Sequence, residues 1–164
     1  MTHYMELLAT NQPWNLLIFM AIPIVLAETL AITELYLLST RNYSSWVHSL
    51  NRMAGLTVGL YFIGVIVYLI KTVVIPITQG GEWRTVIDVV AVASYLIGGL
   101  PLIYIAFQEL GWVNAQATDE SKRQTHAICV ALFLVFGHIA MIAGMLDPAL
   151  LGYVPEGMSE MHNH

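Results

Sequence analysis

The sequence predicts an all-α integral membrane protein, a bundle of four transmembrane helices with both termini on the same, outer side. Of its 164 residues, 57% are hydrophobic and 10% are charged, against about 45–50% and about 25% in soluble domains. So few charges cannot cover the surface of a water-soluble globule. Disordered chains have the opposite composition, rich in charge and poor in apolar residues. The chain also contains four apolar segments, each with the roughly 20 residues that a helix needs to cross a bilayer.

We expect these segments to be helices of one domain covering residues 1–164, because lipid offers no hydrogen-bond partners and each span must pair its own backbone. The expected spans are residues 14–38, 51–77, 86–108 and 126–146. Tryptophans, whose amphipathic rings favour the membrane interface, lie near the ends at Trp14, Trp46, Trp83 and Trp112. A Gln79-Gly80-Gly81 turn separates the second and third spans, and Asp147-Pro148 ends the fourth.

Lys and Arg are divided unequally between the two ends of the expected bundle. One end holds Arg41, Arg52, Lys122 and Arg123, and the other holds Lys71 and Arg84. The positive-inside rule therefore predicts that the first end is cytoplasmic and that the termini face outward. The net charge of −5 provides no basic face for nucleic acid, which is bound by neutralising its phosphates. Cys129 is the single cysteine, so it can form no internal disulfide, and we expect it to be a small buried apolar residue.

Polar side chains inside the spans are the candidate functional residues, because they are costly in a membrane. Glu28 lies about ten residues, or ~15 Å, from the cytoplasmic end of the first span, and His138 lies ~18 Å from the same side. We therefore expect Glu28 and His138 to form a buried carboxylate–imidazole pair near the midplane. Tyr61 and Ser94–Tyr95 fall at the same depth.

Two further layers of polar residues are expected. Near the cytoplasmic surface lie Glu34, His48, Asn51, Arg52, Glu109 and His126. Near the outer surface lie Lys71, Asp88 and Asp147, which we interpret as an interfacial ion cluster.

One functional hypothesis is binding of b-type heme. His48 and His126 share a depth and could be its axial ligands, and Arg52 could neutralise a propionate. His138 would then serve a second centre, or a quinol proton-transfer site with Glu28. His126 and His138 are twelve residues apart, which turns their rings about 120° from each other on one helix. They cannot readily line one interior as two heme ligands.

A second hypothesis is a transition-metal site or a proton relay. Glu28, Glu34 and His138, with His126, offer carboxylate and imidazole ligands suited to iron, zinc or manganese. The Glu-x-x-His pairs of di-iron bundles are absent. As a relay, Glu34, Glu28 and His138 would step from the cytoplasmic face to the midplane, and four spans would require an oligomer. Copper is a further candidate at the termini, whose thioethers and imidazoles are Met1, His3, Met5, Met158, Met161, His162 and His164.

A third hypothesis is an accessory subunit of a larger membrane complex, in which buried polar pairs only hold helices together. Gly55 and Gly59 form a small-xxx-small pair that we assign to packing within the bundle. No phosphate-binding loop, HExxH or serine nucleophile motif is present. The overall expectation is a membrane subunit of a redox or transport system, with heme or quinol chemistry, or a metal or proton transporter as the alternative.

Two stretches carry a resemblance. The first span contains Asn11-Gln-Pro-Trp-Asn, Ala21-Ile-Pro, Leu26-Ala-Glu-Thr and Thr33-Glu-Leu-Tyr. The fourth contains Gly137-His-Ile-Ala-Met-Ile-Ala-Gly-Met-Leu-Asp-Pro. Both are similar to small bacterial inner-membrane proteins often labelled "permease". The resemblance implies a location in the bacterial inner membrane and transfers no site residue.

Overall fold

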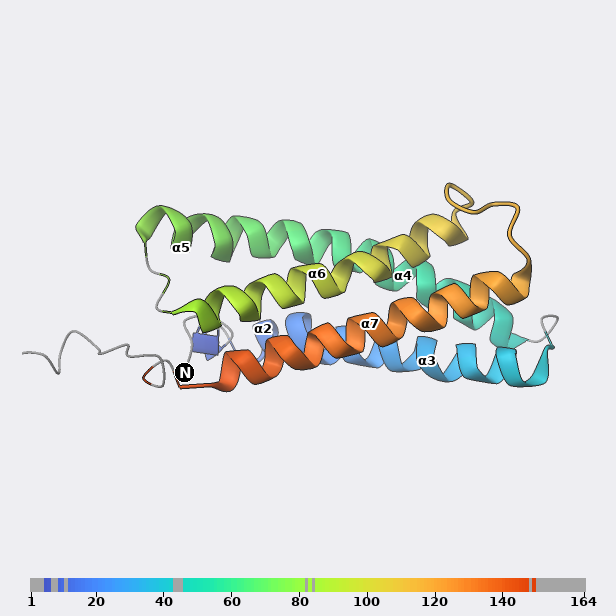
Figure 1. Ribbon diagram of the computed structural model, residues 1–164, viewed down its shortest axis with the longest axis horizontal. Coiled ribbons are helices and arrows are strands. Elements are labelled where there is room, and N and C mark those ends of the chain that lie inside the picture. The colour runs from blue at the N-terminus through green and yellow to red at the C-terminus, as the bar shows by residue number, and fades with distance from the viewer. Residues whose placement is uncertain are drawn as a thin grey trace, which may run out of the picture.

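The structure is a computed structural model that describes residues 5–6, 9–10, 12–42, 46–81, 83, 85–147 and 149. Within these residues it is helical and contains no strand. Four helical segments are long and apolar enough to cross a membrane: Trp14–Thr40, Trp46–Gly80, Val86–Glu109 and Asp119–Met145. The prediction of four apolar helices is confirmed (Figure 1).

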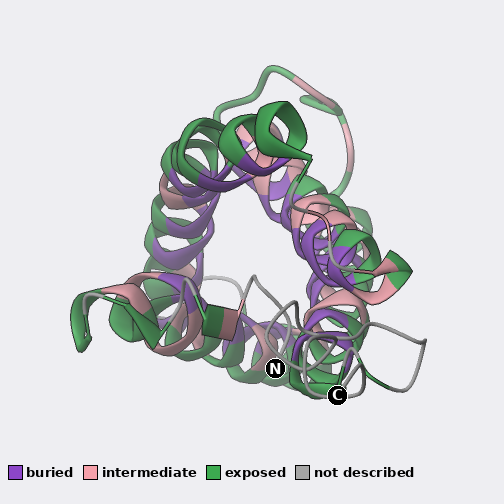
Figure 2. Ribbon diagram, turned by 90° about the vertical axis from the view of Figure 1, so that its left-hand side faces the viewer, coloured by how far each residue is buried: buried purple, intermediate pink, exposed green. Residues whose placement is uncertain are grey.

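Four main helices form the bundle: α3 (Ile22–Thr40), α4 (Trp46–Leu69), α6 (Val86–Glu109) and α7 (Asp119–Met145). Helix α3 packs against α4 and α7, and α6 packs against the same two helices. The order around the bundle is therefore α3, α4, α6, α7, with the buried faces turned inward (Figure 2). Large apolar side chains face outward, for example Ile32, Val86 and Ile142, as expected of a surface solvated by lipid.

Two short π-helices precede prolines, a feature that the sequence analysis did not predict. Segment α2 (Trp14–Leu16) leads through η1 (Leu17–Ala21) into α3, and α4 leads through η2 (Ile70–Val74) into α5 (Ile75–Gly80). Each π-helix is followed by an Ile-Pro pair, at Ile22-Pro23 and Ile75-Pro76. A proline has no N–H and its ring collides with the carbonyl one turn earlier, so a locally widened helix relieves the clash.

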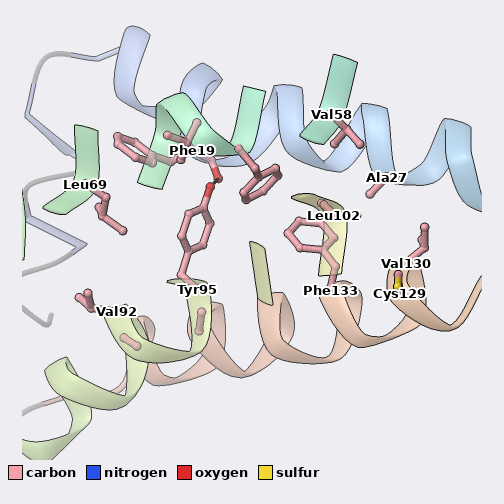
Figure 3. Packing of buried hydrophobic residues seen from close by; sticks show 14 of the residues in the cluster. Phe19, Ala27, Val58, Leu69, Val92, Tyr95, Leu102, Cys129, Val130 and Phe133 are labelled. Atoms are coloured by element: carbon pink, nitrogen blue, oxygen red, sulfur yellow. Dashed lines mark hydrogen bonds between the residues drawn. The ribbon is translucent and has the colours of Figure 1, made fainter. Parts of the chain in front are cut away.

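Tyrosine hydroxyls donate to two backbone carbonyls of η1, in the turn before Pro23. The Tyr61 hydroxyl donates to the Ile18 carbonyl at 2.7 Å, and the Tyr95 hydroxyl donates to the Phe19 carbonyl at 3.0 Å (Figure 3). An unpaired buried carbonyl is costly in lipid. These two bonds therefore tie α4 and α6 to the start of the first span.

Two helices begin earlier than expected. Helix α4 begins at Trp46 rather than near residue 51, and α7 begins at Asp119 rather than near residue 126. The start of α7 is set by Thr118, whose hydroxyl accepts a hydrogen bond from the Ser121 N–H. Acidic residues in the first turn favour the positive end of the helix dipole, and Asp119 and Glu120 supply them. This extra helical length places Arg123 inside the helix rather than in the loop.

The helices approach closely where glycines face a neighbour. A Cβ added at Gly59 would overlap the Cβ of Ala106 and lie 2.8 Å from the Leu102 carbonyl, so α4 and α6 can meet only without a side chain there. A Cβ at Gly55 would lie 3.0 Å from the Ile105 side chain. Packing of these glycines within the bundle is confirmed. Cys129 lies buried in the core, also as predicted (Figure 3).

Candidate functional site

A buried group of polar side chains joins all four main helices near the end of the bundle that carries the α3–α4 and α6–α7 connections. We call it the ionic cluster and define it as Glu34 of α3, Asn51 of α4, Glu109 of α6, and Arg123 and His126 of α7. Glu34, Asn51 and His126 have no exposed surface. The side chain of Glu109 is 8% exposed and that of Arg123 is 2% exposed. Charges this deep in a membrane bundle are costly and need partners.

Arg123 lies at the centre of the ionic cluster. One terminal nitrogen donates to Glu34 Oε1 at 3.1 Å and to Asn51 Oδ1. The other donates to Glu109 Oε1 at 2.8 Å. The guanidinium thus contacts a side chain on each of the other three helices. Charge-assisted bonds of this kind are the strong class of hydrogen bonds.

His126 contacts the same carboxylate as Arg123. Its Nδ1 lies 2.8 Å from Glu34 Oε1 and 3.2 Å from a terminal nitrogen of Arg123. Because the Glu34 carboxylate only accepts and lies nearer to Nδ1 than the guanidinium does, we assign the ring hydrogen to Nδ1, which donates it to Glu34. Nδ1 is also 3.7 Å from Glu109 Oε1. The neutral ring therefore has its lone pair on Nε2.

Asn51 extends the ionic cluster toward α3 through a second bond. Its amide nitrogen donates to Thr33 Oγ1 at 2.8 Å, while Thr33 Oγ1 donates to the Thr29 carbonyl at 2.7 Å. These bonds orient the Asn51 carbonyl oxygen toward Arg123. The amide thus fixes the position of the guanidinium.

The charges of the ionic cluster do not balance with a neutral imidazole. Glu34 and Glu109 bring two negative charges, and Arg123 brings one positive charge. Arg52 lies 3.7 Å from Glu109 Oε2, but its side chain is 60% exposed, so water screens its charge. With a neutral His126, the buried side chains of the ionic cluster therefore carry a formal charge of −1, from two carboxylates and one guanidinium.

Several buried polar atoms at this end have no hydrogen-bond partner. They are Glu34 Oε2, His126 Nε2, Arg123 Nε, and both amide atoms of Gln108. Each belongs to a residue that is at least nine-tenths buried. Buried polar atoms are rarely left unpaired in native proteins, and each such atom needs an explanation.

The structure brings together part of the expected cytoplasmic layer. Glu34, Asn51, Glu109 and His126 meet in the ionic cluster, and Arg52 lies at its rim. His48 is half-buried near the start of α4. Arg123, which the sequence analysis assigned to the loop, is the residue that it missed. The signal that could have found it is the spacing of Arg123 and His126, since residues three apart share one helix face.

The expected buried pair of Glu28 and His138 is not formed. Both side chains are exposed on the surface of the bundle, which corrects the prediction that they lie deep in it. The physical reason is rotation about the helix axis: Glu28 and Glu34 are six residues apart, and the inward face of α3 carries Glu34. Of the expected outer layer, Asp88 is buried whereas Lys71 and Asp147 are exposed.

The described residues include no group of three His, Cys, Asp or Glu side chains that could hold a metal ion. The expected set of Glu28, Glu34 and His138 is divided between the surface and the ionic cluster, where the Arg123 cation lies against Glu34 and His126. The two expected heme ligands differ in burial: His126 has no exposed surface and its Nδ1 lies against Glu34, whereas His48 is half-buried. Heme binding stays a prediction. Most of the expected copper ligands lie outside the described residues; only Met5 is described.

Comparison with known proteins gives one match. No curated protein and no solved structure matched the chain. A family model described as a family of unknown function, DUF6803, matches residues 1–160, and nothing in that match links the chain to a permease label. Because the match covers almost the whole length of this four-helix chain, the chain belongs to the DUF6803 family, whose function is unknown.

Proposed function

We propose that this protein is a small integral membrane subunit of a redox or transport system, and that its ionic cluster binds and releases a proton at one membrane face. The observation that carries the proposal is the state of His126. Its Nδ1 is held by Glu34 Oε1 at 2.8 Å, while its Nε2 is buried without a partner. An imidazole oriented by a carboxylate, with its second nitrogen free, is arranged to accept a proton.

The geometry supports a short route from water to the ionic cluster. Arg52 is exposed and contacts Glu109, whose carboxylate lies at the rim of the cluster. Glu109 Oε1 is 3.7 Å from His126 Nδ1, and His126 in turn contacts Glu34. The three titratable groups therefore lie in series from the rim to the fully buried carboxylate. Both carboxylates lie on the Nδ1 side of the ring and position it, and the proton would be taken up at Nε2, on the opposite edge. Such series of carboxylates and imidazoles are typical of proton pathways in membranes.

The distribution of basic residues supports a proposal for the membrane face. Arg41, Arg52 and Lys122 lie at the same end of the bundle as the ionic cluster, as does Arg123 within it. The positive-inside rule favours placing this end in the cytoplasm and both termini in the periplasm of a bacterial inner membrane. The proton would then exchange with the cytoplasm. We further propose that the subunit works within a homo-oligomer or a larger assembly, since four helices leave little interior for a complete pathway.

The second candidate is an accessory subunit whose ionic cluster only holds the helices together. The contacts of Arg123 with three other helices favour this role, because such contacts fix their register. The two candidates differ in one respect. A proton-binding cluster changes its protonation while the fold stays constant, whereas a purely structural cluster keeps one protonation state throughout.

Infrared difference spectroscopy of the full chain in lipid tests the proposal. A downward pH step should produce bands from a carboxyl group and from an imidazole. Glu34→Gln and His126→Gln should each remove these bands. Glu28→Gln is the matched control, since it changes an exposed carboxylate on the same helix and should leave the cluster bands unchanged. Wild-type protein whose cluster bands never respond to pH, with the helices intact, would support the accessory role instead.

A further inference from the structure

A second feature lies away from the ionic cluster, between the first span and α7. It is a cavity of about 90 Å³ whose walls include Phe19, Tyr95, Phe133, Gly137 and His138. Its lining also contains Ile24 and Met141, which are 42% and 37% exposed on the outer surface of the bundle. The cavity therefore opens toward the side of the protein that faces lipid. A molecule dissolved in the surrounding lipid would reach it through this open side.

His138 is the group in this cavity that can recognise a ligand by hydrogen bonding. Its Nδ1 lies 2.6 Å from the Leu134 carbonyl oxygen. Because a carbonyl can only accept, Nδ1 must carry the hydrogen, and Nε2 of the neutral ring is an acceptor. The hydroxyl of Tyr95 is already donated to the Phe19 carbonyl. A ligand must therefore donate a hydrogen bond if it is to pair with His138.

The remaining walls suit a flat ring. Phe19 and Tyr95 meet edge to face with their centroids 6.3 Å apart, and Phe133 belongs to the same core cluster (Figure 3). Aromatic rings favour such tilted neighbours. Met20 and Met141 add flexible, polarisable side chains, which adapt to a bound group. A Cβ built on Gly137 would meet nothing within 4 Å, so there is open space for a ring beside the α7 backbone.

We infer that this cavity binds the hydroxyl-bearing ring of a membrane quinol, with a ring hydroxyl donating to His138 Nε2. The oxidised quinone has no hydroxyl to donate, so the site distinguishes the two forms by one hydrogen bond. The apolar tail of such a ligand would remain in the bilayer through the open side of the cavity. The cavity and the ionic cluster share no residue. Quinol binding and proton binding can therefore be disproved independently.

Isothermal titration of the full chain in mild detergent tests this inference with three probes: a short-tail benzoquinol, the matching benzoquinone and the di-O-methyl ether of the quinol. The quinol should bind the wild type about tenfold more tightly than the other two probes, which corresponds to one net hydrogen bond. His138→Leu should remove this preference and leave the weaker, common affinity. Equal binding of all three probes by both proteins would overturn the inference and indicate apolar partition only.

A second pair of variants tests the location. Gly137→Leu should fill the cavity and weaken quinol binding while His138 remains. Gly64→Leu is its control, because Gly64 also has open space around an added Cβ but lies on α4, away from the cavity. Quinol binding that survives Gly137→Leu unchanged would contradict the assigned site. The infrared response of the ionic cluster should be the same in all of these variants.

Discussion

His126 Nδ1 lies 2.8 Å from Glu34 Oε1, although the two residues are 92 positions apart in the chain. This contact joins the first membrane helix to the last at a point where neither side chain has exposed surface. Two ionisable groups buried at this distance cannot change charge independently. Arg123, which lies against both, links their combined charge to Glu109 on a third helix. The ionic cluster therefore joins the packing of these helices to one set of buried charges.

Replacing Arg123 by methionine should destabilise the protein strongly. The change leaves the Glu34 and Glu109 carboxylates close together without their shared cation, and breaking a buried ion pair in this way costs about 3–5 kcal/mol. Arg41→Met is the control. The Arg41–Glu120 pair is 3.2 Å apart, but its side chains are 73% and 50% exposed, so its loss should cost less than about 1 kcal/mol. Equilibrium unfolding in mixed detergent micelles measures both. Equal losses in the two variants would show that Arg123 is not a buried partner.

Adding one methyl group at Gly59 should separate α4 from α6. Gly59→Ala places a Cβ against Ala106 and the Leu102 carbonyl, and overpacking of this kind costs about 1–3 kcal/mol. Gly64→Ala, five residues later on the same helix, meets nothing and should be neutral or slightly stabilising, since Ala favours helix over Gly. The same unfolding measurement compares them. If the Gly59→Ala protein were as stable as the Gly64→Ala protein, the close approach of α4 and α6 at Gly59 would be contradicted.

Tyr95→Phe should destabilise the start of the first span because it removes the hydroxyl that donates to the Phe19 carbonyl. Phe19 is four residues before Pro23, so the regular helical donor for its carbonyl is missing. We expect a loss of about 1 kcal/mol. In a Pro23→Ala background the restored N–H should take over this carbonyl, and the cost of Tyr95→Phe should fall. A double-mutant cycle measures that difference. If Tyr95→Phe cost the same free energy in the Pro23→Ala background, the Tyr95 hydrogen bond would not compensate for the missing N–H of Pro23.

The sequence predicts how deep each residue lies in the bundle better than it predicts which side of a helix faces inward. Counting residues from the span ends was enough to bring Glu34, Glu109 and His126 to one level, because a helix rises by a constant amount per residue. The same count placed Glu28 at the midplane but could not show that it faces outward. In a membrane both the lipid side and the inner side of a helix are apolar, so hydrophobic periodicity does not identify the inner face.

Counting residues from the span ends also could not predict where each helix begins or where its local geometry changes. Arg123 was assigned to a loop because charges usually mark the end of a span, yet capping by Thr118 extends α7 by two turns past the apolar segment. The π-helices before Pro23 and Pro76 depend on how each proline clashes with the preceding turn, which a hydropathy pattern does not record. Both features determine the rotation of the helices, and so they decide which polar residues meet.

The most direct test of the proposed function is the nitrogen NMR spectrum of His126 in the lipid-embedded full chain. The protein would carry ¹⁵N-labelled histidine, with His126→Gln used to assign the signals. A proton-binding cluster predicts that Nδ1 stays protonated throughout, held by Glu34, while Nε2 changes from unprotonated to protonated as the pH is lowered. An Nε2 signal that stays constant over the whole pH range in which the protein remains folded would contradict the account.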